Sequence, residues 1–67
     1  MIKKYLARIT QTRDYSSTVH EIEVQLDARE ALRINNTPDG SAAQAYGKMF
    51  FPNADRINRV TFKELKD

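Results

Sequence analysis

The chain of 67 residues has no cysteine and no tryptophan, and it has only two glycines, two prolines and one histidine. Without cysteine it can form neither disulfide bonds nor thiolate metal sites. No apolar run approaches the roughly 20 residues of a membrane-spanning helix, so we expect no membrane contact. Two glycines are too few for a glycine-rich phosphate loop. The hydrophobic share of 40% is enough for one folded domain over residues 1–67.

Neither sign of charge dominates the sequence. Eleven Lys and Arg oppose nine Asp and Glu, which gives a net charge of +2. This excludes an acidic DNA mimic, and the chain also lacks the clustered basic runs of a nonspecific nucleic-acid binder. Arg8 interrupts the apolar stretch that a secretory signal would need, so we expect a cytoplasmic protein.

Two segments, residues 3–12 and 18–26, alternate between apolar and polar residues with a period of two. This is typical of strands with one buried face. Their apolar rows are Tyr5, Ala7 and Ile9, and Ile22, Val24 and Leu26. A turn centred on Tyr15-Ser16 would join them as a hairpin, with Ile9 opposite Ile22 and Arg8 opposite Glu23.

Two short helices are predicted next. Asp27 and Glu30 form a capping box before a helix that ends at Asn35-Asn36, and Ser41 and Gln44 form a second box. Pro52 ends the second helix near Phe50. The predicted buried positions are Ala28, Ala31, Leu32 and Asn35 in the first helix, and Ala42, Ala45, Tyr46, Met49 and Phe50 in the second.

A third strand is predicted over residues 57–65, with Val60 and Phe62 facing the core. The order strand, strand, helix, helix, strand predicts an α+β fold, in which two helices cover one face of a three-stranded antiparallel sheet. We place the last strand beside the first, which gives the strand order 2-1-3.

The sequence contains no recognisable catalytic grouping. His20 has only Ser16, Ser17 and Glu21 as polar sequence neighbours, and Glu21 would point to the opposite sheet face. Glu21 and Glu23 share a face, but opposite Arg8 they are typical of a surface ion pair. We therefore expect a protein that is not an enzyme and that has no cofactor and no metal site.

The uncovered sheet face is the candidate binding site. Its predicted partner-binding residues are four cations bordered by two acids: Lys4, Arg8, Arg59, Lys63, Glu21 and Glu23. Such a surface suits phosphate or an acidic protein patch. A stacking platform for RNA would need aromatic residues here, and Tyr5 and Phe62 fall on the other face.

The layout resembles small α+β proteins of bacteriophages and other mobile elements, among them some anti-CRISPR proteins. Two stretches carry the resemblance: Met1-Ile2-Lys3-Lys4-Tyr5-Leu6-Ala7-Arg8-Ile9, which leads into a hairpin, and Glu21-Ile22-Glu23-Val24-Gln25-Leu26-Asp27-Ala28-Arg29-Glu30-Ala31, a strand that runs into a capped helix. The resemblance implies a stoichiometric inhibitor that blocks a host protein or nucleoprotein surface. It assigns no individual residue.

These observations lead to a non-enzymatic binding protein whose partner is a host protein or a protein–nucleic acid complex. Two alternatives stay open. The same cations could bind DNA or RNA directly. The chain could also be a homodimeric structural domain, in which the edge strand over residues 18–26 pairs with its twin.

Overall fold

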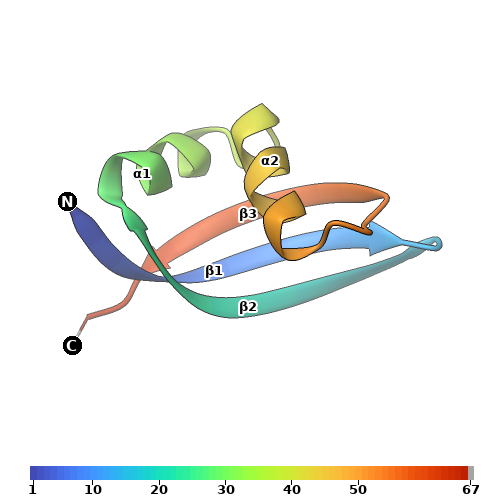
Figure 1. Cartoon of the computed structure of the whole chain (residues 1–67), viewed down its shortest axis with the longest axis horizontal. Coiled ribbons are helices and arrows are strands. Elements are labelled where there is room, and N and C mark those ends of the chain that lie inside the picture. The colour runs from blue at the N-terminus through green and yellow to red at the C-terminus, as the bar shows by residue number, and fades with distance from the viewer. Residues whose placement is uncertain (67) are drawn as a thin grey trace.

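The computed structural model describes residues 1–66 and shows an α+β fold. The elements in chain order are β1 (Ile2–Arg13), β2 (Ser16–Asp27), α1 (Ala28–Asn36), α2 (Ser41–Phe50) and β3 (Arg56–Glu64). The strands form one antiparallel sheet in the order β2-β1-β3, and both helices lie over the same face (Figure 1). The predicted fold class, element order and strand order are confirmed.

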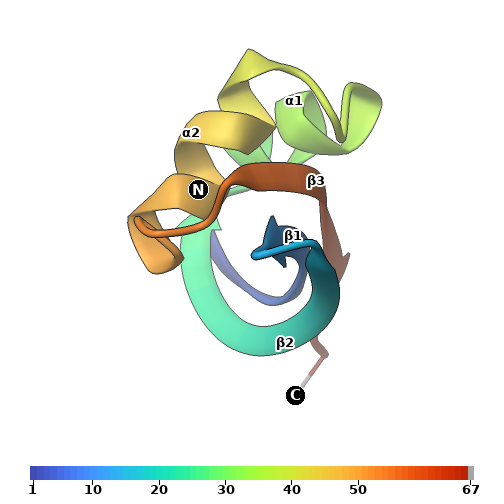
Figure 2. The same ribbon diagram turned by 90° about the vertical axis from the view of Figure 1, so that its right-hand side faces the viewer.

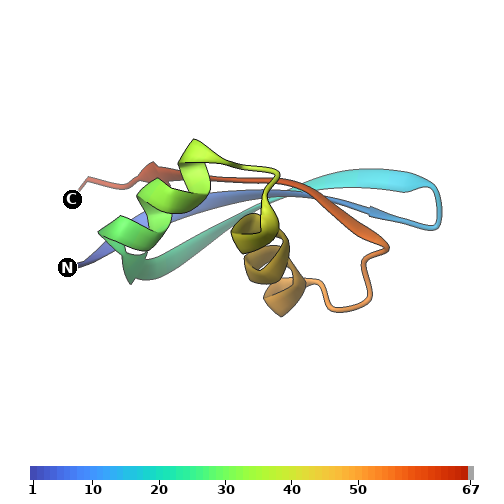
Figure 3. The ribbon, with the colours of Figure 1, turned by 90° about the horizontal axis from the view of Figure 1, so that it is seen from above.

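The β1–β2 hairpin extends past the helices, as Figures 1 and 3 show. Its turn is Asp14-Tyr15, with positive φ angles of 51° and 67°. The pairing places Ile9 opposite His20 and Arg8 opposite Glu21. The predicted turn at Tyr15-Ser16 and the predicted pairing are therefore wrong. Two-residue hairpins favour such left-handed turns because their twist matches that of the strands, but without glycine the sequence gives little sign of one.

The error in the hairpin register leaves the two sheet faces unchanged. The predicted and observed pairings differ by two residues on β2, and side chains alternate with a period of two. Every residue of the hairpin strands therefore keeps its predicted face. A shift of one residue would have exchanged the faces.

β3 contains an extra residue that the period-two pattern did not reveal. Arg59 pairs with Thr10 and Ile57 with Gln11, so Asn58 is a bulge. Its side-chain Oδ1 accepts a hydrogen bond of 2.9 Å from Thr12. The bulge returns Ile57 to the core face, where it is fully buried. The sequence prediction had left Ile57 out of the core.

α1 begins where Asp27 was predicted to cap it. The carboxylate accepts the Arg29 N–H at 2.8 Å and pairs with the amino terminus at 3.0 Å. These two interactions, the backbone hydrogen bond first, lower the pKa of Asp27 below 3.8. The predicted buried stripe was partly wrong: Ala31 and Ile34 are buried, whereas the Leu32 side chain is 62% exposed.

α2 ends at Phe50 as predicted, but its start and its buried stripe differ from the prediction. The cap residue is Gly40 with no side-chain hydrogen bond, and Gln44 instead donates to the Ile57 carbonyl across the helix–sheet interface. The predicted capping box at Ser41 is therefore wrong. The fully buried positions are Ala43 and Gly47.

Glycine at position 47 explains why the buried stripe of α2 was mispredicted. A Cβ at Gly47 would lie 2.5 Å from Ile57 Cγ2, so the helix packs on β3 through a residue that hydrophobicity does not mark. The helix is turned accordingly. Ala45 and Met49 are exposed and Phe50 is 38% exposed, contrary to the prediction, while Ala42 and Tyr46 are half-buried.

The core lies between the helices and the two strands β1 and β3. Tyr46, Phe62 and Tyr5 form a chain of edge-to-face aromatic contacts in it, with ring centroids 5.0 and 6.0 Å apart. The helices cover β2 less, and Figure 2 shows β2 at the side of the sheet away from both helices. The buried core residues are Tyr5, Ala7, Ile9, Ala31, Ile34, Ala43, Ala54, Ile57, Val60 and Phe62, with Ile22, Val24 and Leu26 half-buried.

Candidate binding surface

The sheet face opposite the helices, called the open face below, is ordered in rows by the strand register. Each row crosses β2, β1 and β3 in turn, because paired residues of neighbouring strands point to the same side. The rows are Val19–Thr10–Arg59, Glu21–Arg8–Thr61, Glu23–Leu6–Lys63 and Gln25–Lys4–Leu65. The open face is therefore basic over β1 and β3 and acidic along β2.

The four predicted cations lie on this one face and are exposed. Arg8 and Arg59 occupy adjacent rows of neighbouring strands, so their Cα atoms are separated by about 8 Å, given strands ~4.8 Å apart and a rise of ~3.3 Å per residue. Lys63 lies on β3 one row beyond Arg8, and Lys4 follows on β1. The cations thus form a zigzag along the sheet.

None of these cations is held by an ion pair among residues 1–66. The ion pairs in this part of the chain are formed elsewhere: Met1–Asp27, Lys3–Glu64, Arg13–Asp14 and Glu30–Arg33. An exposed ion pair inside the protein would compete with a partner's anion, although only by about 0–1 kcal/mol. The basic zigzag faces no such competition.

The two predicted acids border the basic zigzag on β2. Glu21 is opposite Arg8, whereas Glu23 is opposite Leu6, so the expected Arg8–Glu23 pair does not form. Within residues 1–66 the side chains of Arg8 and Glu21 are not in ion-pair contact either, despite being in register. The side chains of Glu21 and Glu23 are therefore as accessible to a partner as the basic zigzag.

Two shallow hollows lie on the basic side of the open face. One has a volume of about 340 Å³ and places two guanidinium groups beside two hydroxyl groups; it is lined by Arg8, Thr10, Arg59 and Thr61. The other, of about 310 Å³, is lined by Leu6, Arg8, Glu21, Thr61, Phe62 and Lys63. The first combines the donor groups that proteins use to hold phosphate or carboxylate oxygens.

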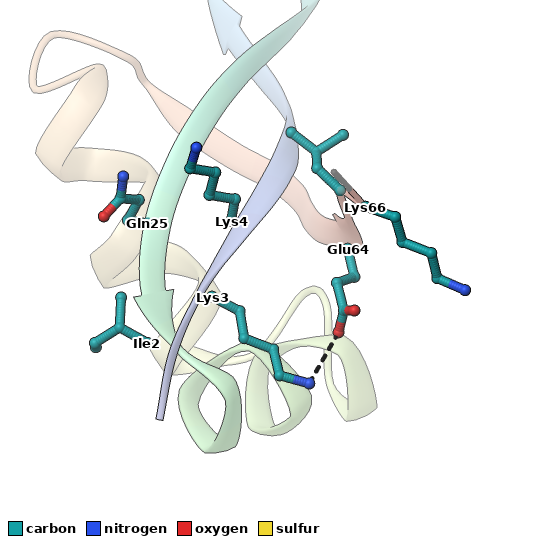
Figure 4. A pocket seen from close by; sticks show the side chains of 7 residues that line it. Ile2, Lys3, Lys4, Gln25, Glu64 and Lys66 are labelled. Carbon is teal, nitrogen blue, oxygen red and sulfur yellow. Dashed lines mark hydrogen bonds and ion pairs between the residues drawn. The ribbon is translucent and has the colours of Figure 1, made fainter.

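A third hollow, of about 550 Å³, lies at the end of the sheet where the β1 and β3 termini meet (Figure 4). Lys3 Nζ is 3.2 Å from Glu64 Oε1 and points away from Lys4. The lining is partly apolar, and its residues are Ile2, Lys3, Lys4, Gln25, Glu64, Leu65 and Lys66. The open face thus continues from a hollow lined only by polar residues, between Arg8 and Arg59, into an end that is partly apolar.

Two residues of the open face were missing from the sequence prediction. Ile2 is 62% exposed and lies two positions before Lys4 on the same side of β1, so extending the alternation would have found it. Arg56 pairs with Thr12 and adds a cation beyond Arg59. The bulge at Asn58 breaks the alternation between Arg56 and Arg59, so the sequence pattern does not show on which sheet face Arg56 lies.

Two side chains with groups capable of acid–base catalysis, His20 and Tyr46, do not line these hollows. His20 is on the helix-covered side, where its ring is 4.5 Å from the Phe51 ring and its Nε2 is 2.9 Å from Thr18 Oγ1. In the part of the chain that the structure describes, no three His, Asp or Glu residues gather as a metal site would require. Burial raises the pKa of the Tyr46 hydroxyl above 10.0.

Comparison of the chain with protein-family models, with curated proteins and with solved structures finds no match in any of the three. None of the helices described is long and apolar enough to cross a membrane.

Proposed function

We propose that this protein is a non-enzymatic binding protein that docks on a host protein or a protein–nucleic acid complex through the basic part of its open face. The observation that carries the proposal is the set of four exposed cations on one face, without ion pairs among residues 1–66. They complement an anionic surface, and such complementarity sets the association rate and the choice of partner.

The resemblance to small phage proteins implies a role for this binding, which is inhibition of a host protein or nucleoprotein. A protein that blocks a host surface needs affinity and no catalytic group, and it acts in a one-to-one ratio with its target. The open face offers a rigid sheet rather than a mobile loop, so little conformational entropy is lost when a partner docks.

Charge reversal on the open face tests the proposal. The triple variant Arg8→Glu, Arg59→Glu, Lys63→Glu changes exposed side chains only, so its circular dichroism and melting curve should stay close to those of the parent. Immobilised parent protein should capture its partner from host lysate after nuclease treatment, and the triple variant should lose this capture.

The matched control reverses three cations away from the open face. Arg13→Glu, Arg29→Glu and Arg33→Glu produce the same change in net charge on the hairpin tip and on α1, also at exposed positions. This variant should retain the partner. Capture that survives in the open-face variant, or that is lost equally in both, would refute the proposed surface.

Direct binding of nucleic acid is the second candidate, and the hollow between Arg8, Thr10, Arg59 and Thr61 favours it. If the four open-face cations each neutralise one phosphate of duplex DNA, log K should fall against log salt with a slope of roughly −3.6. A gel shift at low salt checks this, and absence of any complex with DNA or RNA would exclude this candidate.

A further inference from the structure

The two edge strands of the sheet, β3 and β2, differ in whether their outward-pointing backbone groups have partners. The outer edge of β3 is covered by the last turn of α1 and by the segment that joins α1 to α2. The Val60 N–H donates to the Pro38 carbonyl at 2.9 Å. The Asn35 side chain accepts the Phe62 N–H at 2.8 Å and donates to the Phe62 carbonyl at 3.0 Å, so one amide takes the place of a neighbouring strand. The β3 edge is therefore blocked at Val60 and Phe62, in the middle of the strand.

β2 (Ser16–Asp27) is the other edge strand, and within residues 1–66 no further strand lies along its outer edge. Ala28 N donates to Met1 O, so in this antiparallel pair the even-numbered residues of β2 point their backbone groups at β1. The odd-numbered residues point theirs outward. Within residues 1–66 no other backbone segment bonds to these groups. They are the N–H and C=O groups of Ser17, Val19, Glu21, Glu23 and Gln25.

The side chains of β2 specify what could pair with this edge. On the open face Glu21 and Glu23 are exposed, so cationic side chains on a neighbouring strand would form favourable cross-strand pairs with them. On the helix-covered face Ile22, Val24 and Leu26 are only half-buried, so apolar neighbours would complete their burial. A complementary strand therefore alternates basic and apolar residues.

A second copy of this chain does not meet that requirement. Symmetric antiparallel pairing of β2 with itself, with faces matched and the strands nearly fully overlapped, places Glu21 against Glu21 or Glu21 against Glu23. Like charges directly opposite each other are destabilising. The β3 edge of a second copy is closed by Asn35 and Pro38. Glu21 and Glu23 thus disfavour self-pairing of β2 and favour a basic partner.

We infer that the β2 edge is a strand-addition site for an extended partner segment in which lysine or arginine alternates with valine, isoleucine or leucine. The segment adds a fourth strand beside β2, its backbone bonding to the odd-numbered residues and its cations lying along Glu21 and Glu23. This site goes beyond the proposed function and does not rest on it, because the basic zigzag lies on β1 and β3.

The test uses a capped nine-residue peptide in which lysine alternates with valine, and a control peptide of the same composition with its lysines and valines in separate blocks. Amide hydrogen exchange is followed by NMR on the labelled protein. The alternating peptide should slow exchange at least tenfold at Val19, Glu21 and Glu23, while the even-numbered amides between them stay unchanged. Equal effects of both peptides, or no new protection at the odd positions, would overturn the inference.

Two substitutions at position 23 separate backbone pairing from charge. Glu23→Pro removes an outward N–H that β1 does not use, and proline is tolerated at such edge positions. Glu23→Gln removes the charge and keeps the N–H. The proline variant should bind the peptide at least tenfold more weakly than the glutamine variant. Equal affinities would exclude strand addition.

A charge exchange keeps the inference testable if the proline variant fails to fold. Glu21→Lys with Glu23→Lys should lose the lysine–valine peptide and gain a peptide in which glutamate alternates with valine. Failure to exchange preference, or a stable dimer of the parent protein by light scattering, would overturn the inference. The open-face triple variant should bind the lysine–valine peptide at least as tightly as the parent, so this test can succeed even where the proposed function fails.

Discussion

Replacement of Gly47 by alanine tests the packing of α2 on the sheet. Alanine has a higher helix propensity than glycine by about 1 kcal/mol, so an ordinary helix interior would become more stable. At Gly47 the added Cβ would lie 2.5, 2.9 and 3.0 Å from Cγ2, Cγ1 and Cδ1 of Ile57, which is fully buried. Neither the helix nor β3 can yield without disturbing the core.

Steric crowding should therefore outweigh the gain in propensity. Overpacking a core by one carbon atom costs about 1–3 kcal/mol, so Gly47→Ala should lower the free energy of unfolding by a net ~1 kcal/mol. In a domain of this size that lowers the melting temperature by about 4–8 °C. Urea unfolding followed by circular dichroism measures the difference directly.

Two further variants isolate the cause. Ala45 is exposed on the same helix, and Ala45→Gly should cost about 1 kcal/mol from propensity alone. Ile57→Ala removes all three atoms that crowd position 47, and in that background Gly47→Ala should become stabilising. Because Ile57→Ala itself costs about 2–5 kcal/mol, the pair is compared in a stabilising osmolyte. A Gly47→Ala protein as stable as the parent would refute the reasoning.

The other two predictions concern the β3 edge and the cap of α1. Asn35→Ala should lower the free energy of unfolding in urea by about 1–3 kcal/mol, because it leaves the Phe62 N–H and C=O without partners. Asn36→Ala, at the neighbouring exposed position, should be nearly neutral. Similar values for both variants would contradict the role of Asn35 at the β3 edge. The lowered pKa of Asp27 implies stability that is present above pH ~3.8 and is lost as the pH falls through the lower folded-state value. The melting temperature of Asp27→Asn should therefore fall less than that of the parent between about pH 5 and about pH 2, and parallel curves would disprove this linkage.

The fold was predicted correctly where apolar and polar residues alternate regularly, because the alternation shows which side chains face the core. Alternation over residues 3–12 and 18–26 identified the faces of β1 and β2, and it survived a wrong hairpin register because the error was two residues. The turn itself was mispredicted. Asp14 and Tyr15 adopt positive φ without glycine, and the surrounding hairpin imposes this conformation.

The helix faces were harder to predict because hydrophobicity and burial disagree there. Leu32 and Met49 are large and apolar but exposed, whereas Gly47 and Ala43 form the contact with the sheet. A glycine can be buried because a helix approaches closely, and a single sequence does not show that approach. Ile57 was missed for a related reason, since the bulge before Arg59 breaks the alternation.

The candidate site divides in the same way. The common face of Lys4, Arg8, Arg59 and Lys63 was predicted correctly from strand periodicity and the strand order 2-1-3. The closing of the β3 edge by Asn35 was not predicted, because an amide that bonds to a distant backbone leaves no local signal. That contact depends on how α1 lies over the sheet, which only the folded chain reveals.

Of the five elements described, the central strand β1 comes first, and β3, on which the helices mainly rest, comes last. A growing polypeptide that has released only its hairpin and first helix displays the row of Tyr5, Ala7 and Ile9 with little to shield it from water. The missing neighbours, Val60 and Phe62, belong to β3 and are synthesised after both helices. Productive folding therefore waits until β3 has been synthesised, and the interval before it is when the nascent chain most needs protection from aggregation.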